Sequence, residues 1–233
     1  MKPLFYIDKI PANIRSQFDA KVRQVSNNLG LPNPDWLMAV MYSESKLNPA
    51  IKNPIGCVGL TQFCPDKYGG STKTIAGKKY LLSDISKMSA IQQLDLIQAY
   101  FMPYKSKLKS YQDLALLNFF PIAVGKPDSF VIKSDTIPAS KIYSQNPAIA
   151  KFSPKQGEIT VGTFKRYIDN IMAVAIKQSG ATDKEVKKIS KDLGFAERHK
   201  GIIFWGSAIL MGSIIYFGGR VAYKKYKIFK DGE

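Results

Sequence analysis

The chain has 233 residues, 45% of them hydrophobic, and its 34 Lys and Arg against 18 Asp and Glu give a formal charge of +16. These values allow one domain of ordinary size with an appendage and exclude an intrinsically disordered chain. The charge favours an anionic partner, which wall polymer, phospholipid or nucleic acid would each satisfy. Because basic and apolar residues are interleaved along the chain, we expect most of the charge to form a solvated surface, with no specific nucleic-acid site.

Residues 1–180 show helical periodicity nearly throughout. Apolar side chains recur every three or four residues from Ile14 to Leu29, and a glycine follows, which predicts a first helix that stops there. Residues 33–35, Asn-Pro-Asp, supply a cap, a proline for the first helical position and an acid for the first turn. They predict a second helix, which stops before the Asn-Pro of residues 48–49.

A third helix is predicted to begin at Ser89, because Gln92 completes a capping box with it. The apolar face of this helix consists of Ile91, Leu94, Ile97 and Phe101. No alternating strand of useful length occurs, although residues 65–82 can form a minor hairpin. We therefore predict a mainly α fold, with a globular helical domain over residues 1–180.

The C-terminal part has a different character, because residues 202–219 carry no charged side chain. At 1.5 Å per residue this run reaches about 27 Å, close to the roughly 30 Å of a bilayer's hydrocarbon core. We predict a single transmembrane helix over residues 201–223, preceded by a charged linker helix at 181–200 and followed by a basic tail at 224–233. A buried core helix is the alternative.

The orientation of this helix does not follow from the positive-inside rule, because the basic residues on its two sides are balanced. They are Lys187, Lys188, Lys191, Arg198 and Lys200 before it, and Arg220, Lys224, Lys225, Lys227 and Lys230 after it.

Cys57 and Cys64 are too few for a disulfide framework and lack the companions that a zinc site needs. Their spacing is compatible with two reduced, buried thiols or with one disulfide. We favour the thiols, because a separation of this length does not show that the two Cα atoms come within bonding distance.

Glu44 is the candidate for catalysis. It shares a helical face with Leu37, Val40 and Met41 and lies in the last turn of the predicted second helix. Burial and the negative end of the helix dipole would both raise its pKa. A carboxyl that stays protonated near neutral pH can act as a general acid in glycosidic cleavage, although most Glu residues at helix ends are merely solvated.

Two motifs surround this residue. Glu44-Ser45 precedes the Asn-Pro of residues 48–49, and a Gly-Leu-x-Gln-x-x-Pro motif follows, formed by Gly59, Leu60, Gln62 and Pro65. Together they resemble the soluble lytic transglycosylases, a branch of the goose-type lysozyme superfamily, over roughly residues 20–170. Phage-borne members are the most similar, because the segment that begins at Leu114 resembles theirs as well.

The resemblance implies a lysozyme-like fold and a peptidoglycan substrate. In such enzymes one Glu, here Glu44, protonates the bond between N-acetylmuramic acid and N-acetylglucosamine and then helps to close a 1,6-anhydro ring. The substrate-binding residues implied are Ser45, Gly59, Leu60, Gln62 and Asn118, together with Tyr143 or Tyr167 as the tyrosine that supports the catalytic Glu. Asn118 stands in a segment that departs from the common Ala-Tyr-Asn-x-Gly form, and we slightly favour Tyr143 over Tyr167.

The resemblance also suggests that a calcium loop has been lost near residues 152–163. Placing Gly157 at the loop's glycine puts no carboxylate at the ligand positions, which are occupied by Phe152, Pro154, Gln156 and Thr163. We therefore expect no metal and no other cofactor, with only the backbone turn retained.

Three functions remain open from the sequence: lytic transglycosylation, hydrolysis of the same bond by a lysozyme-type enzyme, and a non-catalytic wall-binding or structural role. We favour the first. The first residues lack the apolar core of a secretory signal, so we expect a virion component that reaches the host periplasm and cell wall in a membrane-containing particle. Its partners would then be peptidoglycan strands, the lipid bilayer through residues 201–223, and other virion proteins.

Overall fold

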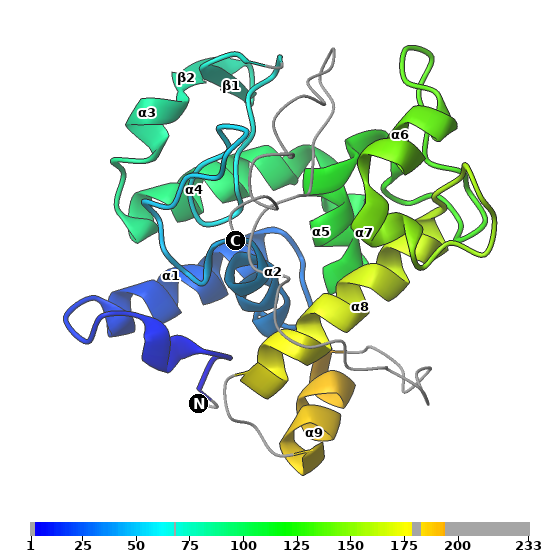
Figure 1. The fold of residues 1–233 in the computed structure, drawn as a ribbon. Helices are drawn as coiled ribbons and strands as arrows, with labels where there is room; N and C mark the ends of the chain where they lie inside the picture. The colour runs from blue at the N-terminus through cyan, green and yellow to red at the C-terminus, as the bar shows by residue number, and fades with distance from the viewer. Residues whose placement is uncertain (1–2, 68, 179–182, 194–233) are drawn as a thin grey trace, which may run out of the picture.

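The structure is a computed structural model, and it describes residues 3–67, 69–178 and 183–193. Helices dominate this part of the chain, and a single two-stranded sheet accompanies them (Figure 1). The elements are η1 (Ile7–Lys9), α1 (Arg15–Asn28), α2 (Asp35–Ser45), β1 (Thr72–Ile75), β2 (Lys78–Leu81), α3 (Leu82–Ile85), α4 (Ala90–Phe101), η2 (Met102–Lys107), α5 (Tyr111–Phe119), η3 (Pro121–Ala123), α6 (Ala139–Gln145), α7 (Pro147–Ala150), α8 (Val161–Gln178) and α9 (Asp183–Leu193). The predicted mainly α fold is confirmed for these residues.

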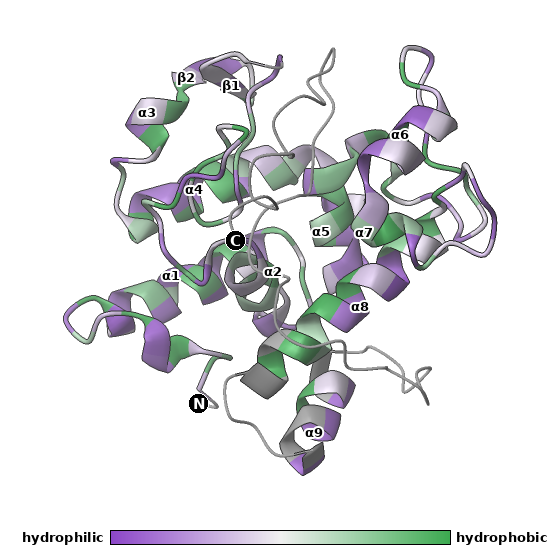
Figure 2. Ribbon diagram, viewed as in Figure 1, coloured by the Kyte–Doolittle hydropathy of each residue, from purple (hydrophilic) through white to green (hydrophobic). Residues whose placement is uncertain are grey.

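Helix α2 lies at the centre of the molecule, in contact with α1, α5 and α8 (Figure 1). Its residues from Trp36 to Met41 are all buried, although most of a helix surface usually faces water. The outer helices α1 and α8 instead alternate between hydrophobic and hydrophilic colours along their length, as expected where one face meets the core (Figure 2). The end of α2 is therefore held from several sides, which is how the fold fixes residues in its last turn.

The predicted first helix is confirmed as α1. Phe18, Val22, Val25 and Leu29 are each fully buried on its inner face. Gly30 then takes a positive φ of 67°, the left-handed conformation in which glycine commonly ends a helix.

The predicted second helix is confirmed as α2, although it begins one residue later than its cap signal suggests. Pro34 is the N-cap, and Asn33 Oδ1 accepts a hydrogen bond from the Asp35 backbone N–H at 2.9 Å. At the other end, Lys46 and Leu47 adopt left-handed φ values of 54° and 64°. Two such residues in succession turn the chain sharply directly after the helix.

The predicted capping box is confirmed at the start of α4. The Gln92 N–H donates to Ser89 Oγ at 3.2 Å, and the Ser89 N–H donates to Gln92 Oε1 at 2.9 Å. The minor hairpin is confirmed as β1–β2, which pair antiparallel through a two-residue turn at Ala76 and Gly77. Both turn residues have positive φ, as tight hairpin turns require.

The predicted transmembrane helix, residues 201–223, lies outside the described residues. Within the described part of the chain, no helix combines the length and the apolar character needed to cross a bilayer. Helix α9, in contact with α8, falls inside the segment that we predicted as a linker helix, 181–200. The domain boundaries stay predictions.

Candidate active site

Glu44 lies in the last turn of α2, on the face that carries the fully buried Leu37 and Met41. The residue as a whole is half-buried, so part of it faces solvent. Burial raises the pKa of Glu44 from 4.5 to about 8, because the dense apolar surroundings disfavour the charged form. The carboxyl therefore carries its proton at neutral pH.

Tyr167, on α8, is the tyrosine that the structure brings close to Glu44. The pKa of its hydroxyl is raised to about 12, first by burial and then by the negative charge of Glu44. Tyr143, which we slightly favoured, lies on α6, half-buried at the edge of the core. The contact between α2 and α8 explains the difference, since it places the Tyr167 side of α8 against the helix that carries Glu44. Tyr167 is both a core residue, 7% exposed, and a neighbour of Glu44.

The chain that leaves α2 forms a tight loop over residues 57–64, called here loop 57–64. Val58 and Phe63 pair at its base through two backbone hydrogen bonds of 3.0 and 2.8 Å. Gly59 and Gln62 adopt positive φ values of 82° and 53°, and the Gln62 N–H donates to Gly59 O at 3.0 Å. The Gly-Leu-x-Gln motif is thus a closed turn between two paired residues.

Ser45 and Leu60 hold this loop onto α2. Both side chains are fully buried, and Ser45 Oγ lies 2.8 Å from Met41 O and 2.9 Å from Leu60 O. A hydroxyl has one hydrogen, so it donates to one of these carbonyls at a time. The structure therefore places Ser45 and Leu60 beneath the site, where they position the loop and do not face a ligand.

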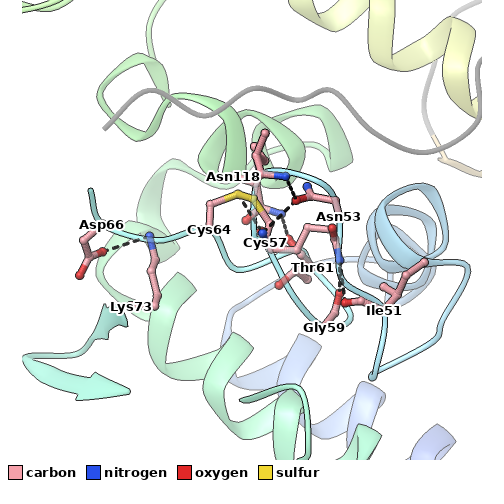
Figure 3. The surroundings of a disulfide bond; sticks show 11 residues. Ile51, Asn53, Cys57, Gly59, Thr61, Cys64, Asp66, Lys73 and Asn118 are labelled. Carbon is pink, nitrogen blue, oxygen red and sulfur yellow. Dashed lines mark hydrogen bonds and ion pairs between the residues drawn. A yellow bond between two sulfur atoms is a disulfide. The ribbon is translucent and has the colours of Figure 1, made fainter. Parts of the chain in front are cut away.

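Gln62 and Asn118 also have contacts within the loop. Gln62 Nε2 donates to Gly59 O at 3.0 Å, and its side chain is half-buried. Asn118, from α5, donates through Nδ2 to Thr61 O at 2.9 Å. Asn118 thereby fastens the loop to α5, beside Thr61 (Figure 3), and Gln62 is the most exposed of the motif's side chains.

Cys57 and Cys64 form a disulfide, which corrects our preference for two free thiols. The Val58–Phe63 pairing brings the two cysteines opposite one another, because they flank the paired residues directly. Figure 3 shows the bond closing the loop, with Asn53 beside it, whose Oδ1 accepts from the Cys57 N–H at 2.9 Å. The sequence does not reveal this pairing, because it depends on the turn geometry.

The loop continues into the hairpin through Asp66 and Lys73. Asp66 Oδ2 accepts from the Thr74 N–H at 2.7 Å, and Lys73 Nζ lies 3.5 Å from Asp66 Oδ1 (Figure 3). Lys73 is only 5% exposed, and burial lowers its pKa against the opposing effect of Asp66. The ammonium also lies 4.9 Å from the centre of the Tyr100 ring, so the hairpin is anchored to α4.

Residues 20–94 match the family model described as the Transglycosylase SLT domain. The match covers 75 of the 233 residues. This model describes lytic transglycosylases of the lysozyme-like superfamily, enzymes that act on peptidoglycan. The matched segment runs from α1 into α4 and includes Glu44 and all of loop 57–64. Comparison with curated proteins and with solved structures found no match.

Sequence reasoning missed Gln93, which lies just inside the end of the SLT match. Its side chain is fully buried, and its Oε1 accepts from the Leu60 N–H at 2.8 Å. The sequence held a signal for this burial, because Gln93 is next to Leu94 and lies on the inner side of α4. Ile91, which we placed on the apolar face, is only partly buried. A buried amide requires hydrogen-bond partners, and one of those that Gln93 has is the backbone of loop 57–64.

The segment of the predicted lost calcium loop forms a turn in which Gly157 has a φ of 82°. Thr160 pairs with Val131 in an isolated bridge just after it. Ser153 Oγ donates to Glu158 O at 2.5 Å across the turn. Among the described residues, no cluster of three or more His, Cys, Asp or Glu could hold a metal ion. The absence of a metal site stays a prediction.

Proposed function

We propose that the protein is a peptidoglycan lytic transglycosylase in which Glu44 is the single catalytic acid and base. The observation that carries this proposal is the half-buried carboxyl whose pKa is raised to about 8 at the end of the central helix of an SLT domain. A general acid must hold its proton at the working pH and lose it readily to the leaving group. Glu44 meets the first condition through burial.

In the proposed reaction the proton of Glu44 passes to the glycosidic oxygen between N-acetylmuramic acid and N-acetylglucosamine as the bond from C1 breaks. The resulting carboxylate then takes the proton of the muramoyl C6 hydroxyl, whose oxygen bonds to C1 and closes the 1,6-anhydro ring. The same carboxyl is regenerated, so a second catalytic acid is not required. Tyr167 stays neutral, because its pKa is about 12, and its hydroxyl can donate to the transient carboxylate.

Loop 57–64 would form the floor on which the glycan lies. Gln62 is its half-buried polar side chain, and we assign its amide oxygen to a sugar hydroxyl or N-acetyl N–H. Asn118 and Ser45 contribute indirectly, by holding the loop through Thr61 and Leu60. The overall positive charge of the chain suits the anionic peptide substituents of peptidoglycan.

We also propose that residues 201–223 anchor the enzyme in a bilayer, because the uncharged run at 202–219 has the length of a hydrocarbon core. The resemblance to phage enzymes suggests a virion membrane as that bilayer and the host wall as the place of action. Virion proteins would then be neighbours of the anchored enzyme.

Mass spectrometry of muropeptides released from purified peptidoglycan tests the proposed reaction. Lytic transglycosylation gives 1,6-anhydro-muramoyl ends, whereas hydrolysis gives reducing ends. Glu44→Gln is the negative control, and Glu158→Gln, which removes a carboxyl from a turn remote in the sequence, is the matched positive control. Reducing ends alone would replace the proposal by a lysozyme-type hydrolase, and no products from the wild type would indicate a non-catalytic role.

A further inference from the structure

Gln93 is a buried amide whose hydrogen-bonding groups are all directed at backbone. Its Nε2 donates to Pro49 O at 2.7 Å and to Ile85 O at 2.9 Å, and its Oε1 accepts from the Leu60 N–H at 2.8 Å. Met88 O also lies 3.4 Å from Nε2, a longer contact than the other two. A primary amide has two N–H donors and one carbonyl, so the two short Nε2 bonds use both hydrogens and the Leu60 bond uses the oxygen. The side chain joins α4 to the nearby end of α3 at Ile85 and to two segments distant in sequence, at Pro49 and Leu60.

Two of these segments belong to the active site. Pro49 follows the turn that ends the catalytic helix, and Leu60 is in the middle of loop 57–64. Leu60 has a partner at both of its backbone groups, since its N–H donates to Gln93 and its C=O lies 2.9 Å from Ser45 Oγ, which donates either to it or to Met41 O. Ser45 is the residue next to Glu44, so the loop and the catalytic carboxyl share one chain of contacts.

The loop also lies directly against the Gln93 side chain. A Cβ atom built on Gly59 would come within 2.5 Å of Gln93 Oε1, closer than real Cβ atoms approach an oxygen. The glycine of the motif therefore serves two needs, the positive φ of 82° and the close approach of the amide. A loop that shifted by even one ångström would lose the Leu60 hydrogen bond.

We propose that Gln93 is a positioning residue for glycan binding. Its amide fixes loop 57–64 relative to the catalytic helix, and without the amide the loop no longer holds the conformation that binds the sugar. This inference rests on the proposed function, in which the loop binds the glycan. Gln93 itself is fully buried and touches no substrate. Loss of the Gln93 amide lowers the affinity for substrate, whereas loss of the Glu44 carboxyl lowers the rate of the chemical step.

The first test measures the loop itself, independently of activity. Gln93→Met keeps the length of the side chain and removes the amide, and Gln98→Met on the same helix is the matched control, because Gln98 accepts from Asn28 at the α1–α4 contact instead. Hydrogen–deuterium exchange should be faster in loop 57–64 for Gln93→Met by at least about tenfold at the Leu60 amide, since an amide that loses its acceptor opens more readily. In Gln98→Met the loop should exchange at the wild-type rate. A wild-type rate in Gln93→Met overturns the proposal.

The second test measures glycan binding with the chemistry switched off. In a Glu44→Gln background, titration calorimetry with a soluble β-1,4-linked N-acetylglucosamine oligomer should show the Kd raised by about tenfold or more for Gln93→Met, and less than about twofold for Gln98→Met, because loss of a preformed site weakens binding. Circular dichroism melts establish that each variant is folded at the titration temperature. If Gln93→Met exchanges faster in loop 57–64 but binds the oligomer with unchanged affinity, the positioning role is overturned.

A third variant distinguishes the hydrogen bonds that the Gln93 amide donates from the packing of its side chain. Gln93→Glu in the same background has a carboxyl that can donate and accept when protonated but only accept when ionised, facing the carbonyls of Pro49 and Ile85. Its oligomer affinity should therefore recover as the pH falls, while that of Gln93→Met stays weak. No such recovery would also count against the role. Failure of the proposed function looks different, because then the wild type releases no anhydro-muropeptides, whatever the Gln93 variants do to the loop and to oligomer binding.

Discussion

Replacing Glu44 by Gln should lower activity and raise stability, and both effects come from the same buried carboxyl. Gln keeps the size of the side chain and removes the exchangeable proton. Loss of a general acid costs at least about 100-fold in rate, so anhydro-muropeptide release should fall by that factor. For the wild type, activity should persist up to about pH 8 and decline above it, because the acid must be protonated.

The effect on stability follows from the two pKa values of Glu44, 4.5 for the free group and about 8 in the folded protein. Between these pH values the unfolded chain has lost the Glu44 proton while the folded chain retains it. The folded state therefore binds more protons, and its stability falls as the pH rises through this window. At about 1.36 kcal/mol per unit, the full shift corresponds to an upper limit of about 5 kcal/mol above pH 8.

Because Glu44 is half-buried, water lowers the free-energy difference below this upper limit. We expect Glu44→Gln to be more stable than the wild type by roughly 2–3 kcal/mol at pH 8. Below pH 4.5 both side chains are neutral and the two proteins should be nearly equal in stability. Urea unfolding at pH 4.5, 6 and 8, followed by circular dichroism, measures the difference. A gap between Glu44→Gln and the wild type that does not widen with pH would show that the carboxyl is not held neutral. Near wild-type muropeptide release by Glu44→Gln would show that it is not the catalyst.

Four further outcomes are expected. Tyr167→Phe should lower the rate of peptidoglycan cleavage by about tenfold, as for loss of a hydrogen bond to a charged group, whereas Tyr143→Phe should leave it within about twofold; the reverse order would reassign the supporting tyrosine. The Cys57→Ser, Cys64→Ser double variant should lose about 2–3 kcal/mol in urea unfolding, the loop-closure effect of a short disulfide, and an unchanged midpoint would mean that the bond does not form. Millimolar EDTA should leave the Tm unchanged, and a fall of several degrees that calcium reverses would reveal a metal site. Deleting residues 201–233 should remove the need for detergent while wall cleavage persists; aggregation with lost helicity would identify a core helix instead.

The local elements of the fold could be predicted from the sequence, because short-range contacts determine them. The capping box of α4 involves Ser89 and Gln92 alone, and both of its hydrogen bonds form as expected. The apolar spacing that ends at Leu29 likewise determines which face of α1 is buried. Glu44 could be singled out for the same reason, since its place on an apolar helical face follows from periodicity.

Other features depended on segments that meet only in the folded chain. The Cys57–Cys64 disulfide exists because Val58 and Phe63 pair across a closed turn, which separation in sequence does not show. Tyr167 approaches Glu44 because α8 packs on α2, a contact between residues more than a hundred positions apart. Helical spacing alone could not distinguish a Tyr167 that supports Glu44 from a Tyr167 that packs in the core. In the structure Tyr167 does both.

The roles of the motif residues were decided in the same way. The sequence identified Ser45 and Leu60 by their motif and could not separate contact with a ligand from support beneath it. Burial separates the two, because the buried Ser45 hydroxyl bonds to backbone carbonyls and the Leu60 side chain packs in the core, so neither side chain reaches a sugar. Gln93 shows the limit most clearly. An amide's function depends on which donors and acceptors the fold brings within about 3 Å of it, and Leu60 and Pro49 are brought to Gln93 only by tertiary packing.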